Sequence, residues 1–359
     1  MQWIPAILIL PYVFMLLIIF RSLIQIKTFK ASTEPYTFIS VIVACLNEQK
    51  NLPVLLNSLA SQNYPKDLFE VIIVDDNSND NTMEIATEFT GMSNILAISN
   101  KGEGKKQALR TGITASNGKL IITTDADCTM EKNWIRTIAA FYEMNKAEMI
   151  ICPVSIASEP GFFRRFQELE FLSLQGVTAG SACSGKATMC NGANLAFTRE
   201  VYLNHSDNLH DEINTGDDIF LLHSLKKVRG SKIFWLESSD ALVTTESSST
   251  IGSFLKQRKR WISKGKAYKD SYTIILSIVT FTAIILQLFY FIAGLIYPVL
   301  TGVFLAILVL KSVPDFLILL NSSGRYNKRY LMRWFLPAQL LYPFYVLSVV
   351  LYSLTFRDK

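Results

Sequence analysis

The chain has 359 residues, of which 50% are hydrophobic and only 18% are charged, whereas a soluble domain carries about 25% charged residues. This composition excludes an intrinsically disordered chain, and five cysteines without a C-x-x-C pair exclude a disulfide scaffold. The net charge of +5 is too small to indicate a nucleic-acid-binding protein.

The N-terminal segment carries no charged side chain before Arg21. A membrane-spanning helix needs about 20 apolar residues, so residues 3–23 are predicted to span a bilayer. The alternative is a cleaved signal peptide, but no basic residue precedes the apolar stretch and no small-residue cleavage site follows it. We therefore expect a retained anchor over residues 1–26.

The next segment alternates between short, β-branched apolar runs and helical stretches. Strands are predicted at residues 38–44, 69–74, 95–99 and 119–124, and helices at residues 50–62, 80–90 and 104–116. Near-continuous apolar strands separated by helices indicate an α/β fold with a parallel sheet covered on both faces. Ligands bind such sheets beyond the carboxyl ends of the strands.

Polar clusters follow three of these predicted strands, and they are Asn47-Glu48, Asp75-Asp76 and Asp125-Ala126-Asp127. Any one of them could simply cap a helix or form a turn. Acidic clusters gathered at one edge of a sheet would repel each other unless a cation or a donor-rich ligand lay between them. Together they favour a binding site.

The D-x-D sequence at Asp125 and Asp127 predicts a divalent metal site. Mg²⁺ and Mn²⁺ prefer oxygen ligands, and Mg²⁺ is usually held by one or two carboxylates together with substrate phosphates. The histidines and cysteines show no zinc-ligand spacing. The chain has no G-x-x-x-x-G-K-[ST] sequence, and no G-x-G-x-x-G follows the first strand, which argues against a P-loop NTPase and a nicotinamide dehydrogenase.

Two further helices are predicted before the C-terminal region. Residues 160–175 place several Phe and Leu side chains on one face, so this helix would lie in a membrane interface or pack against the catalytic domain. A second helix, over residues 218–227, begins at Asp217 and Asp218. The alternative role for these two carboxylates is a simple N-cap.

The C-terminal region contains long uncharged runs. They predict spans at residues 272–290, 293–310 and 335–355, with a tight turn near residues 291–294 and a second interfacial segment at residues 313–320. Lys and Arg cluster after the first span, before the second and between the third and fourth. The positive-inside rule places all of these clusters in the cytoplasm, where the cysteines would stay reduced.

The basic cluster before the second predicted span covers residues 253–269, with seven Lys and Arg and no acidic residue. Attraction to anionic lipid is one explanation for this segment.

Seven segments of the chain resemble, in order, motifs of the family 2 membrane glycosyltransferases, the group that contains cellulose, hyaluronan and chitin synthases and ceramide glucosyltransferases. They are V-I-V-A-C-L-N-E (41–48), V-D-D-N-S-N-D-N-T (74–82), G-K-K-Q-A-L (104–109), T-D-A-D (124–127), N-G-A-N (191–194), G-D-D (216–218) and Q-R-K-R-W (257–261). The resemblance implies a GT-A domain, the Rossmann-like fold of nucleotide-diphospho-sugar transferases, over residues 38–270. Residues 1–26 and 271–359 would supply α-helical transmembrane segments.

The resemblance also implies a role for each matched position. The nucleotide would be held by Ala44, Asn47, Glu48, Asp75 and Asp76. Lys105 would lie near the diphosphate, with Lys106 as an alternative, and Asp125 and Asp127 would bind Mg²⁺ or Mn²⁺. Asp218, preceded by Asp217, takes the position of the general base. The Q-x-x-R-W motif, near the diphosphate and acceptor, consists of Gln257, Arg260 and Trp261. The first motif lacks the usual proline, and G-D-D replaces T-E-D, which blurs the choice of substrate.

These roles predict an inverting transferase that makes a β-linkage from an α-linked donor. The metal with Lys105 and Arg260 would stabilise charge on the leaving nucleoside diphosphate, and Asp218 would accept the proton of the attacking hydroxyl. The expected partners are a nucleotide sugar, in the first instance a UDP-sugar, and a lipid or glycan acceptor at the bilayer. The expected location is a bacterial cytoplasmic (inner) membrane, and the sequence indicates no oligomeric state.

Three hypotheses about function differ in their use of the membrane region. Transfer of one sugar to a lipid or lipid-linked acceptor is preferred, because the predicted spans carry few polar residues and a processive polysaccharide synthase coupled to secretion needs a polar tunnel. The third hypothesis is an inactive sugar-nucleotide-binding subunit or a channel. The intact motifs and the absence of charge from the long apolar runs disfavour it.

Overall fold

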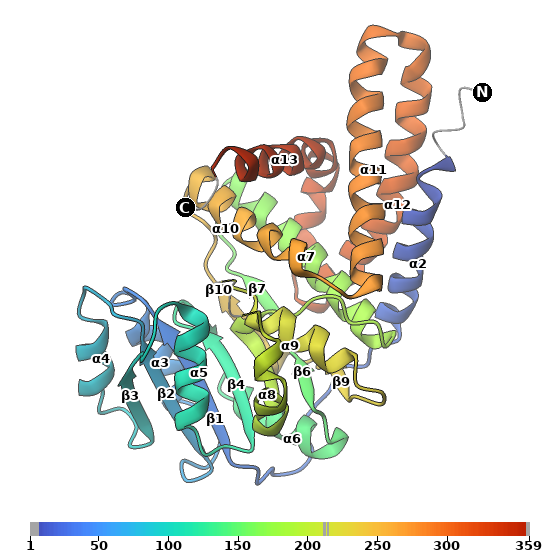
Figure 1. The fold of residues 1–359 in the computed structure, drawn as a ribbon. Coiled ribbons are helices and arrows are strands. Elements are labelled where there is room, and N and C mark those ends of the chain that lie inside the picture. The colour runs from blue at the N-terminus through green and yellow to red at the C-terminus, as the bar shows by residue number, and fades with distance from the viewer. Residues whose placement is uncertain (1–6, 211–212, 214, 357–359) are drawn as a thin grey trace. The chain divides into compact units, whose positions relative to one another are not determined.

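The computed structural model describes residues 7–210, 213 and 215–356 (Figure 1). These residues form two compact units. The α/β unit comprises Lys27–Ala157 and Met189–Glu246, and the helical unit comprises the described residues of Met1–Ile26, Ser158–Thr188 and Ser247–Lys359.

The functional boundaries expected from the sequence, with domains at residues 1–26, 38–270 and 271–359, rest on hydropathy and motifs rather than on compactness. They therefore remain a prediction.

The α/β unit is built on a seven-stranded sheet in the order β3-β2-β1-β4-β8-β6-β9 (Figure 1). The strands are β1 (Ile39–Cys45), β2 (Phe69–Asp75), β3 (Ile95–Ser99), β4 (Leu120–Asp125), β6 (Met149–Ile151), β8 (Leu195–Thr198) and β9 (Ile233–Trp235). A small second sheet has the order β5-β10-β7, from Thr129–Met130, Val243–Thr245 and Val154–Ile156.

Helices connect the strands of this unit. They are α3 (Leu52–Ala60), α4 (Thr82–Glu88), α5 (Lys105–Ala115), α6 (Trp134–Asn145), α8 (Arg199–His205) and α9 (Asp217–Lys226). Helix α5 packs closely on β1 and β2 at Gly112, where an added Cβ would lie 2.7 Å from a methyl group of Ile42 and 2.9 Å from one of Val74. Contacts under about 3 Å do not occur between real side chains, so the α5–sheet spacing requires glycine.

The four predicted strands and three predicted helices of the first half are confirmed, but the all-parallel sheet is only partly correct. Strands β3, β2, β1 and β4 are parallel, whereas β8 runs antiparallel to both β4 and β6. A short buried strand is apolar whichever way it runs, so hydrophobicity could not reveal the direction of β8.

The helical unit contains six α-helices among the described residues of its three segments. They are α2 (Leu10–Ile24), α7 (Phe162–Cys183), α10 (Ile251–Ser263), α11 (Ser271–Ile296), α12 (Thr301–Arg325) and α13 (Phe335–Thr355). Three stretches of described chain are long and apolar enough to cross a membrane: Ser271–Ile296, Pro298–Arg325 and Arg329–Thr355. Helix α2 is apolar but has only 15 residues. Part of the predicted first span, residues 3–6, lies outside the described residues.

Two predictions for the C-terminal region are wrong. The turn between the first two C-terminal helices lies at Pro298–Leu300 rather than near residues 291–294. Most of the predicted span at residues 293–310 and all of the predicted interfacial segment at residues 313–320 belong to one continuous helix, α12. Charged and proline residues in the middle of this helix suggested a break, but the side chains around it satisfy the charges.

The charged residues in the middle of α12 belong to a buried polar cluster around Lys311. Its Nζ donates to Asp315 Oδ2 (2.8 Å) and to Gln339 Oε1 (3.0 Å), and Lys311 is only 2% exposed. Asp315 also accepts from Tyr12 Oη (2.5 Å) and Gln339 Nε2 (2.7 Å). The cluster joins α2, α12 and α13, and it places a charged pair inside a helix expected to lie in the membrane.

The predicted amphipathic helix at residues 160–175 is present but longer, because α7 continues to Cys183. Its apolar face is buried with Phe254, Leu319 and Phe335 of the same unit. Of these partners, Phe254 falls in the predicted catalytic domain, whereas Leu319 and Phe335 fall in the predicted membrane region. The apolar face of α7 is therefore buried by packing within the helical unit.

Removing Lys311 alone should destabilise the protein strongly. Lys311→Met leaves Asp315 as a buried charge without its cation, which costs about 3–5 kcal/mol in buried pairs. The double variant Lys311→Met/Asp315→Leu removes both charges and should recover most of that loss. Thermal unfolding midpoints of the full chain in detergent test this, and equal midpoints for the single and double variants would contradict it.

Candidate active site

Three predicted polar clusters lie at one edge of the parallel part of the main sheet. In the register of this sheet, Cys45 at the end of β1 pairs with Asp75 of β2, and Ala44 pairs with Asp125 of β4. The strands therefore end at nearly the same level. We call this edge, with the loops that follow β1, β2 and β4, the acidic rim.

The loops after β1 and β2 are tied to each other. Asn47 N donates to Ser78 Oγ (2.9 Å), and Asn79 N donates to Asn47 Oδ1 (2.8 Å). Asn47 has a positive φ of 58°, a conformation that asparagine tolerates better than most residues. Glu48 N donates to Thr82 Oγ1 (2.8 Å). Asn47 and Glu48 therefore hold the loops of the rim together.

The two carboxylates at the end of β2 differ in what they bind. Asp76 Oδ1 accepts from Asn100 Nδ2 (2.6 Å) and from the backbone of Gly104 (3.0 Å) at the start of α5. Asp75 Oδ2 accepts from Ser78 N (3.2 Å), but Asp75 Oδ1 is buried with no hydrogen-bond partner among the described residues. A buried acceptor of this kind calls for a donor from a ligand or water.

Lys105 begins α5 and forms an ion pair with Asp125. Burial lowers the pKa of Lys105, but the nearby carboxylates of Asp125, Asp217 and Asp218 outweigh burial and raise it above its usual value. This electrostatic coupling links the D-x-D motif to the start of α9.

The adjacent Lys106 has a different role from the predicted alternative near the diphosphate. Its buried Nζ donates to the backbone carbonyls of Leu209, His210 and Ile213, each at 2.7 Å. Lys106 therefore anchors the chain before α9 rather than facing the rim.

Asp127, like Asp125, is half-buried. Its Oδ2 accepts from Thr245 Oγ1 (2.9 Å). Burial and the charge of Asp125 raise the pKa of Asp127. Burial also raises the pKa of Glu48. The negative charges of Asp127 and Asp125 raise it further, whereas a hydrogen bond from Asn51 lowers it. The rim thus carries excess negative charge that a cation would relieve.

The D-x-D pair fits a hard divalent metal whose remaining ligands come from a substrate. Both side chains offer carboxylate oxygens, which Mg²⁺ and Mn²⁺ prefer. Within the described part of the chain, no three His, Cys, Asp or Glu side chains gather closely enough to hold an ion by themselves. Bound phosphates would have to complete the coordination of a metal at Asp125 and Asp127.

Asp217 and Asp218 form the first turn of α9, after Gly216, whose φ is 97°. Asp218 Oδ2 accepts from the backbone of Gly192 (3.1 Å), and its Oδ1 accepts from Ile219 N (2.8 Å). The alternative considered from the sequence, a simple N-cap, is wrong, because the N-cap residue of α9 is Gly216 and no described side chain caps the helix. Asp217 and Asp218 are instead the first two residues of the helix.

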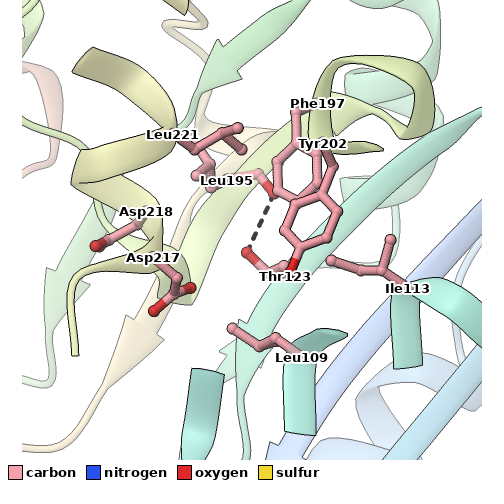
Figure 2. Close-up of a pocket in the computed structure, with 9 residues that line it drawn as sticks. All are labelled: Leu109, Ile113, Thr123, Leu195, Phe197, Tyr202, Asp217, Asp218 and Leu221. Atoms are coloured by element: carbon pink, nitrogen blue, oxygen red, sulfur yellow. Dashed lines mark hydrogen bonds between the residues drawn. The ribbon is translucent and has the colours of Figure 1, made fainter. Parts of the chain in front are cut away.

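A small apolar cavity lies beside these carboxylates. Figure 2 shows Asp217 and Asp218 at one edge and the rings of Phe197 and Tyr202 at the other. Its volume is about 10 Å³, room for about one water molecule. The cavity is far too small for a sugar, so it is not itself the sugar site.

Sequence reasoning missed the residues that support this arrangement. Asn194 is fully buried; its Oδ1 accepts from Trp134 Nε1 (3.0 Å) and its Nδ2 donates to the Pro153 and Ala241 carbonyls. It thereby fixes the turn that presents Gly192 N to Asp218. The N-G-A-N motif was visible in the sequence, but its structural role was not.

The residues of the Q-x-x-R-W motif belong to the helical unit. Gln257, Arg260 and Trp261 lie on α10, which begins with a capping box between Thr250 and Ser253. Arg260 is exposed, whereas Gln257 and Trp261 are partly buried.

Comparisons with known proteins agree with this fold. The family described as "Glycosyl transferase family 2" matches residues 40–205. Glycosyltransferase AglE of Haloferax volcanii is 38% identical over 105 residues, which cover 29% of this chain and 34% of that protein. The chain therefore spans about a third of the length of this relative.

A second relative is a dolichyl N-acetyl-alpha-D-glucosaminyl phosphate 3-beta-D-2,3-diacetamido-2,3-dideoxy-beta-D-glucuronosyltransferase from Methanococcus voltae. It is 25% identical, and the match covers 72% of this chain and 83% of that protein. Two other curated relatives are matched over only 41% and 20% of their own lengths.

Among solved structures, a mannosyltransferase from Pyrobaculum calidifontis in complex with GDP-Man and Mn²⁺ aligns over 100% of both chains, with a TM-score of 0.60 and 16% identity. At that identity the likeness concerns the fold alone. The fold and the site define a GT-A α/β domain with a mixed sheet, in a chain with three long apolar C-terminal helices. The matched part of this domain, residues 40–205, is similar to family 2 glycosyltransferases. The narrower grouping with cellulose and hyaluronan synthases or ceramide glucosyltransferases stays a prediction.

Asp127→Asn should make the metal-free protein at least as stable as the wild type, because it removes a half-buried carboxylate that repels Asp125. Since the pKa of Asp127 is raised in the folded state, this carboxylate costs stability as pH rises to neutrality, so the gain should be larger at neutral than at acidic pH. Mn²⁺ should raise the unfolding midpoint of the wild type but not of the variant.

The exposed Asp67→Asn serves as the control for this measurement, because Asp67 lies outside the rim. A Mn²⁺-induced shift of full size in Asp127→Asn would count against the D-x-D metal site.

Proposed function

We propose that this protein transfers a sugar from a nucleoside-diphosphate sugar to a lipid or lipid-linked acceptor, with inversion at the anomeric carbon. The observation that carries the proposal is the acidic rim, where the D-x-D pair, Lys105 and the start of α9 are electrostatically linked. A site of this charge needs cations and hydrogen-bond donors, which a metal–nucleotide complex supplies.

The nucleotide end of the donor would occupy the β1 and β2 part of the rim. The orphaned Asp75 Oδ1 would accept from the base or ribose, and Asn47 and Glu48 would close the pocket beside Ala44. Asp76 contributes indirectly, because its hydrogen bonds hold the start of α5 and therefore Lys105. The resemblance favours UDP, so a donor panel should include both UDP- and GDP-sugars.

The diphosphate would meet the D-x-D pair. A Mg²⁺ or Mn²⁺ held by Asp125 and Asp127 supplies Lewis-acid stabilisation of the leaving diphosphate. Thr245 fixes the orientation of Asp127. Lys105 would exchange part of its ion pair with Asp125 for the phosphate oxygens. Gln257, Arg260 and Trp261 are assigned to the diphosphate and acceptor by the motif resemblance alone.

Asp218 would act as the general base, with Asp217 beside it. A base must be held in one orientation to remove a proton from the attacking hydroxyl. The hydrogen bond from Gly192 N to Oδ2 orients the Asp218 carboxylate, and the buried Asn194 fixes that turn. In-line attack on an α-linked donor would yield a β-linked product.

The acceptor is assigned from the apolar helices. Three helices of spanning length indicate that the protein is associated with a membrane, and the Methanococcus voltae relative is named for a dolichyl-linked acceptor. Polar groups within the helices bind one another at Lys311, Asp315 and Gln339, which supports a lipid acceptor over a polysaccharide tunnel. We place the α/β unit in the cytoplasm on the basis of the positive-inside rule.

Asp218→Asn keeps the shape of the side chain and can still accept from Gly192 N. Its kcat should fall by about 10²–10⁴-fold, the usual contribution of a general base, while binding of the donor nucleotide persists. The kcat of Asp217→Asn, a change in the same helical turn, should fall by less. Radiolabelled transfer and nucleotide titration on purified protein test this, and a wild-type kcat in Asp218→Asn would remove Asp218 from the mechanism.

The size of the product distinguishes the two enzymatic hypotheses. With a labelled nucleotide sugar and a lipid extract, a single labelled lipid species supports the proposal. Labelled polymer of high molecular mass would show a processive synthase instead. If no sugar nucleotide in the UDP and GDP panel is consumed, the inactive subunit becomes the better explanation.

A further inference from the structure

The Q-x-x-R-W motif contains a residue that its consensus leaves undefined, Arg258, and this side chain is buried. Arg258 is 4% exposed, although it lies in a segment with seven Lys and Arg residues. A cation that leaves solvent must be paired and hydrogen-bonded. Its contacts, all within the helical unit, show what it does there.

On one side Arg258 is fixed by α7 and α13. Its Nη2 and Nε donate to the two carboxylate oxygens of Glu170, at 2.6 and 3.2 Å, and Nε also lies 3.2 Å from Tyr345 Oη. Glu170 has 6% side-chain exposure and accepts a further bond from Tyr345 Oη (3.1 Å). The planar guanidinium is therefore locked in one orientation by a two-point ion pair.

On the other side Arg258 holds two residues of the motif. Its Nη1 donates to Gln257 Oε1 at 2.6 Å, and its guanidinium lies 4.0 Å from the centroid of the Trp261 ring. The Trp261 ring also packs against Phe171 of α7. Arg258 thus bridges Glu170 to both Gln257 and Trp261, the motif residues expected to meet the substrates.

A second anchor connects the same two helices at the beginning of α10. Gln167 is 1% exposed; its Nε2 donates to the carbonyl of Ser248 (3.0 Å), and its Oε1 accepts from Ser248 N (2.9 Å). These bonds fix the chain two residues before the Thr250 cap. The buried polar side chains of α7 therefore set both the entry and the rotation of α10.

We propose that Arg258 and Glu170 are positioning residues for sugar transfer, which hold Gln257 and Trp261 in their working orientation. The inference rests on the proposed function, because it assumes that these two residues meet the donor and acceptor. It assigns a role to α7 beyond packing: this helix carries the carboxylate that orients the motif.

Lysine cannot replace arginine in this role. The variant Arg258→Lys would retain a positive charge for Glu170, but a single ammonium cannot form a two-point ion pair, donate to Gln257 and lie flat on Trp261 at once. A purely structural ion pair would tolerate Arg258→Lys. A positioning residue would not, and this difference separates the two roles.

The experiment compares Arg258→Lys, Glu170→Gln and Lys328→Met in the full chain, purified in detergent or nanodiscs. Lys328 is a matched control, because it forms a buried ion pair with Glu168 of the same helix α7 but lies in the segment between α12 and α13. For Arg258→Lys and Glu170→Gln, kcat should fall about 10- to 100-fold, the scale of a small misplacement, with the donor KM changed far less. Lys328→Met should lower the unfolding midpoint and leave the kcat of the folded protein unchanged.

A second readout does not require turnover. In protein labelled with 5-fluorotryptophan, the Trp261 resonance is assigned from its loss in Trp261→Phe. It should shift or broaden in Arg258→Lys and Glu170→Gln and stay at its wild-type position in Lys328→Met. A wild-type kcat and an unmoved Trp261 resonance in Arg258→Lys would overturn the positioning role.

Failure of the proposed function gives a different result. If the wild type consumes no nucleotide sugar, that function falls, and the fluorine spectra alone decide whether Arg258 orients Trp261. If the wild type is active and Arg258→Lys matches it, only the positioning role falls.

Discussion

Carboxylate repulsion at the acidic rim is the constraint on which the α/β unit depends. Parallel pairing of β2, β1 and β4 ends three strands at one level, and each strand delivers acidic side chains there. Such crowding costs stability unless opposite charge or hydrogen bonds offset it. Lys105, Thr245 and the backbone N–H groups of Gly104 and Gly192 supply part of the compensation. The rest is left for a ligand, which is how a binding site differs from a merely acidic surface.

The helical unit also contains charged side chains that are costly to bury, but it does not leave them for a ligand. Its buried charges are matched within the protein, at Lys311 with Asp315, at Arg258 with Glu170 and at Lys328 with Glu168. Buried pairs of this kind add little net stability compared with apolar side chains, but breaking one is costly. They therefore specify which helix faces act as partners. In α7, buried polar residues select α10 and the segment before α13 as its neighbours.

Much of the α/β unit was predictable because local signals agreed. Apolar β-branched runs, helix periodicity and turn residues marked β1 to β4 and α3 to α5, and the polar ends of the strands located the rim. The direction of β8 was not predictable, since pairing partners that are distant in sequence decide it. Lys106 shows the same limit for a site: its neighbour Lys105 faces the D-x-D motif, but only the fold shows that Lys106 points to carbonyls. The continuity of α12 likewise depended on Tyr12 and Gln339, which lie far from Lys311 in the sequence.

The Lys106 anchor has a consequence for how this chain can vary. It binds main-chain oxygens of Leu209, His210 and Ile213, which every amino acid possesses. The anchor is therefore indifferent to the side chains of the segment that it holds. The side chains at two of these positions are constrained by other contacts, because Leu209 is fully buried and the His210 ring, on a residue with a φ of 57°, packs against Phe220. Ile213 is therefore the position of the three at which the side chain can change while the Lys106 anchor before Asp217 and Asp218 is kept.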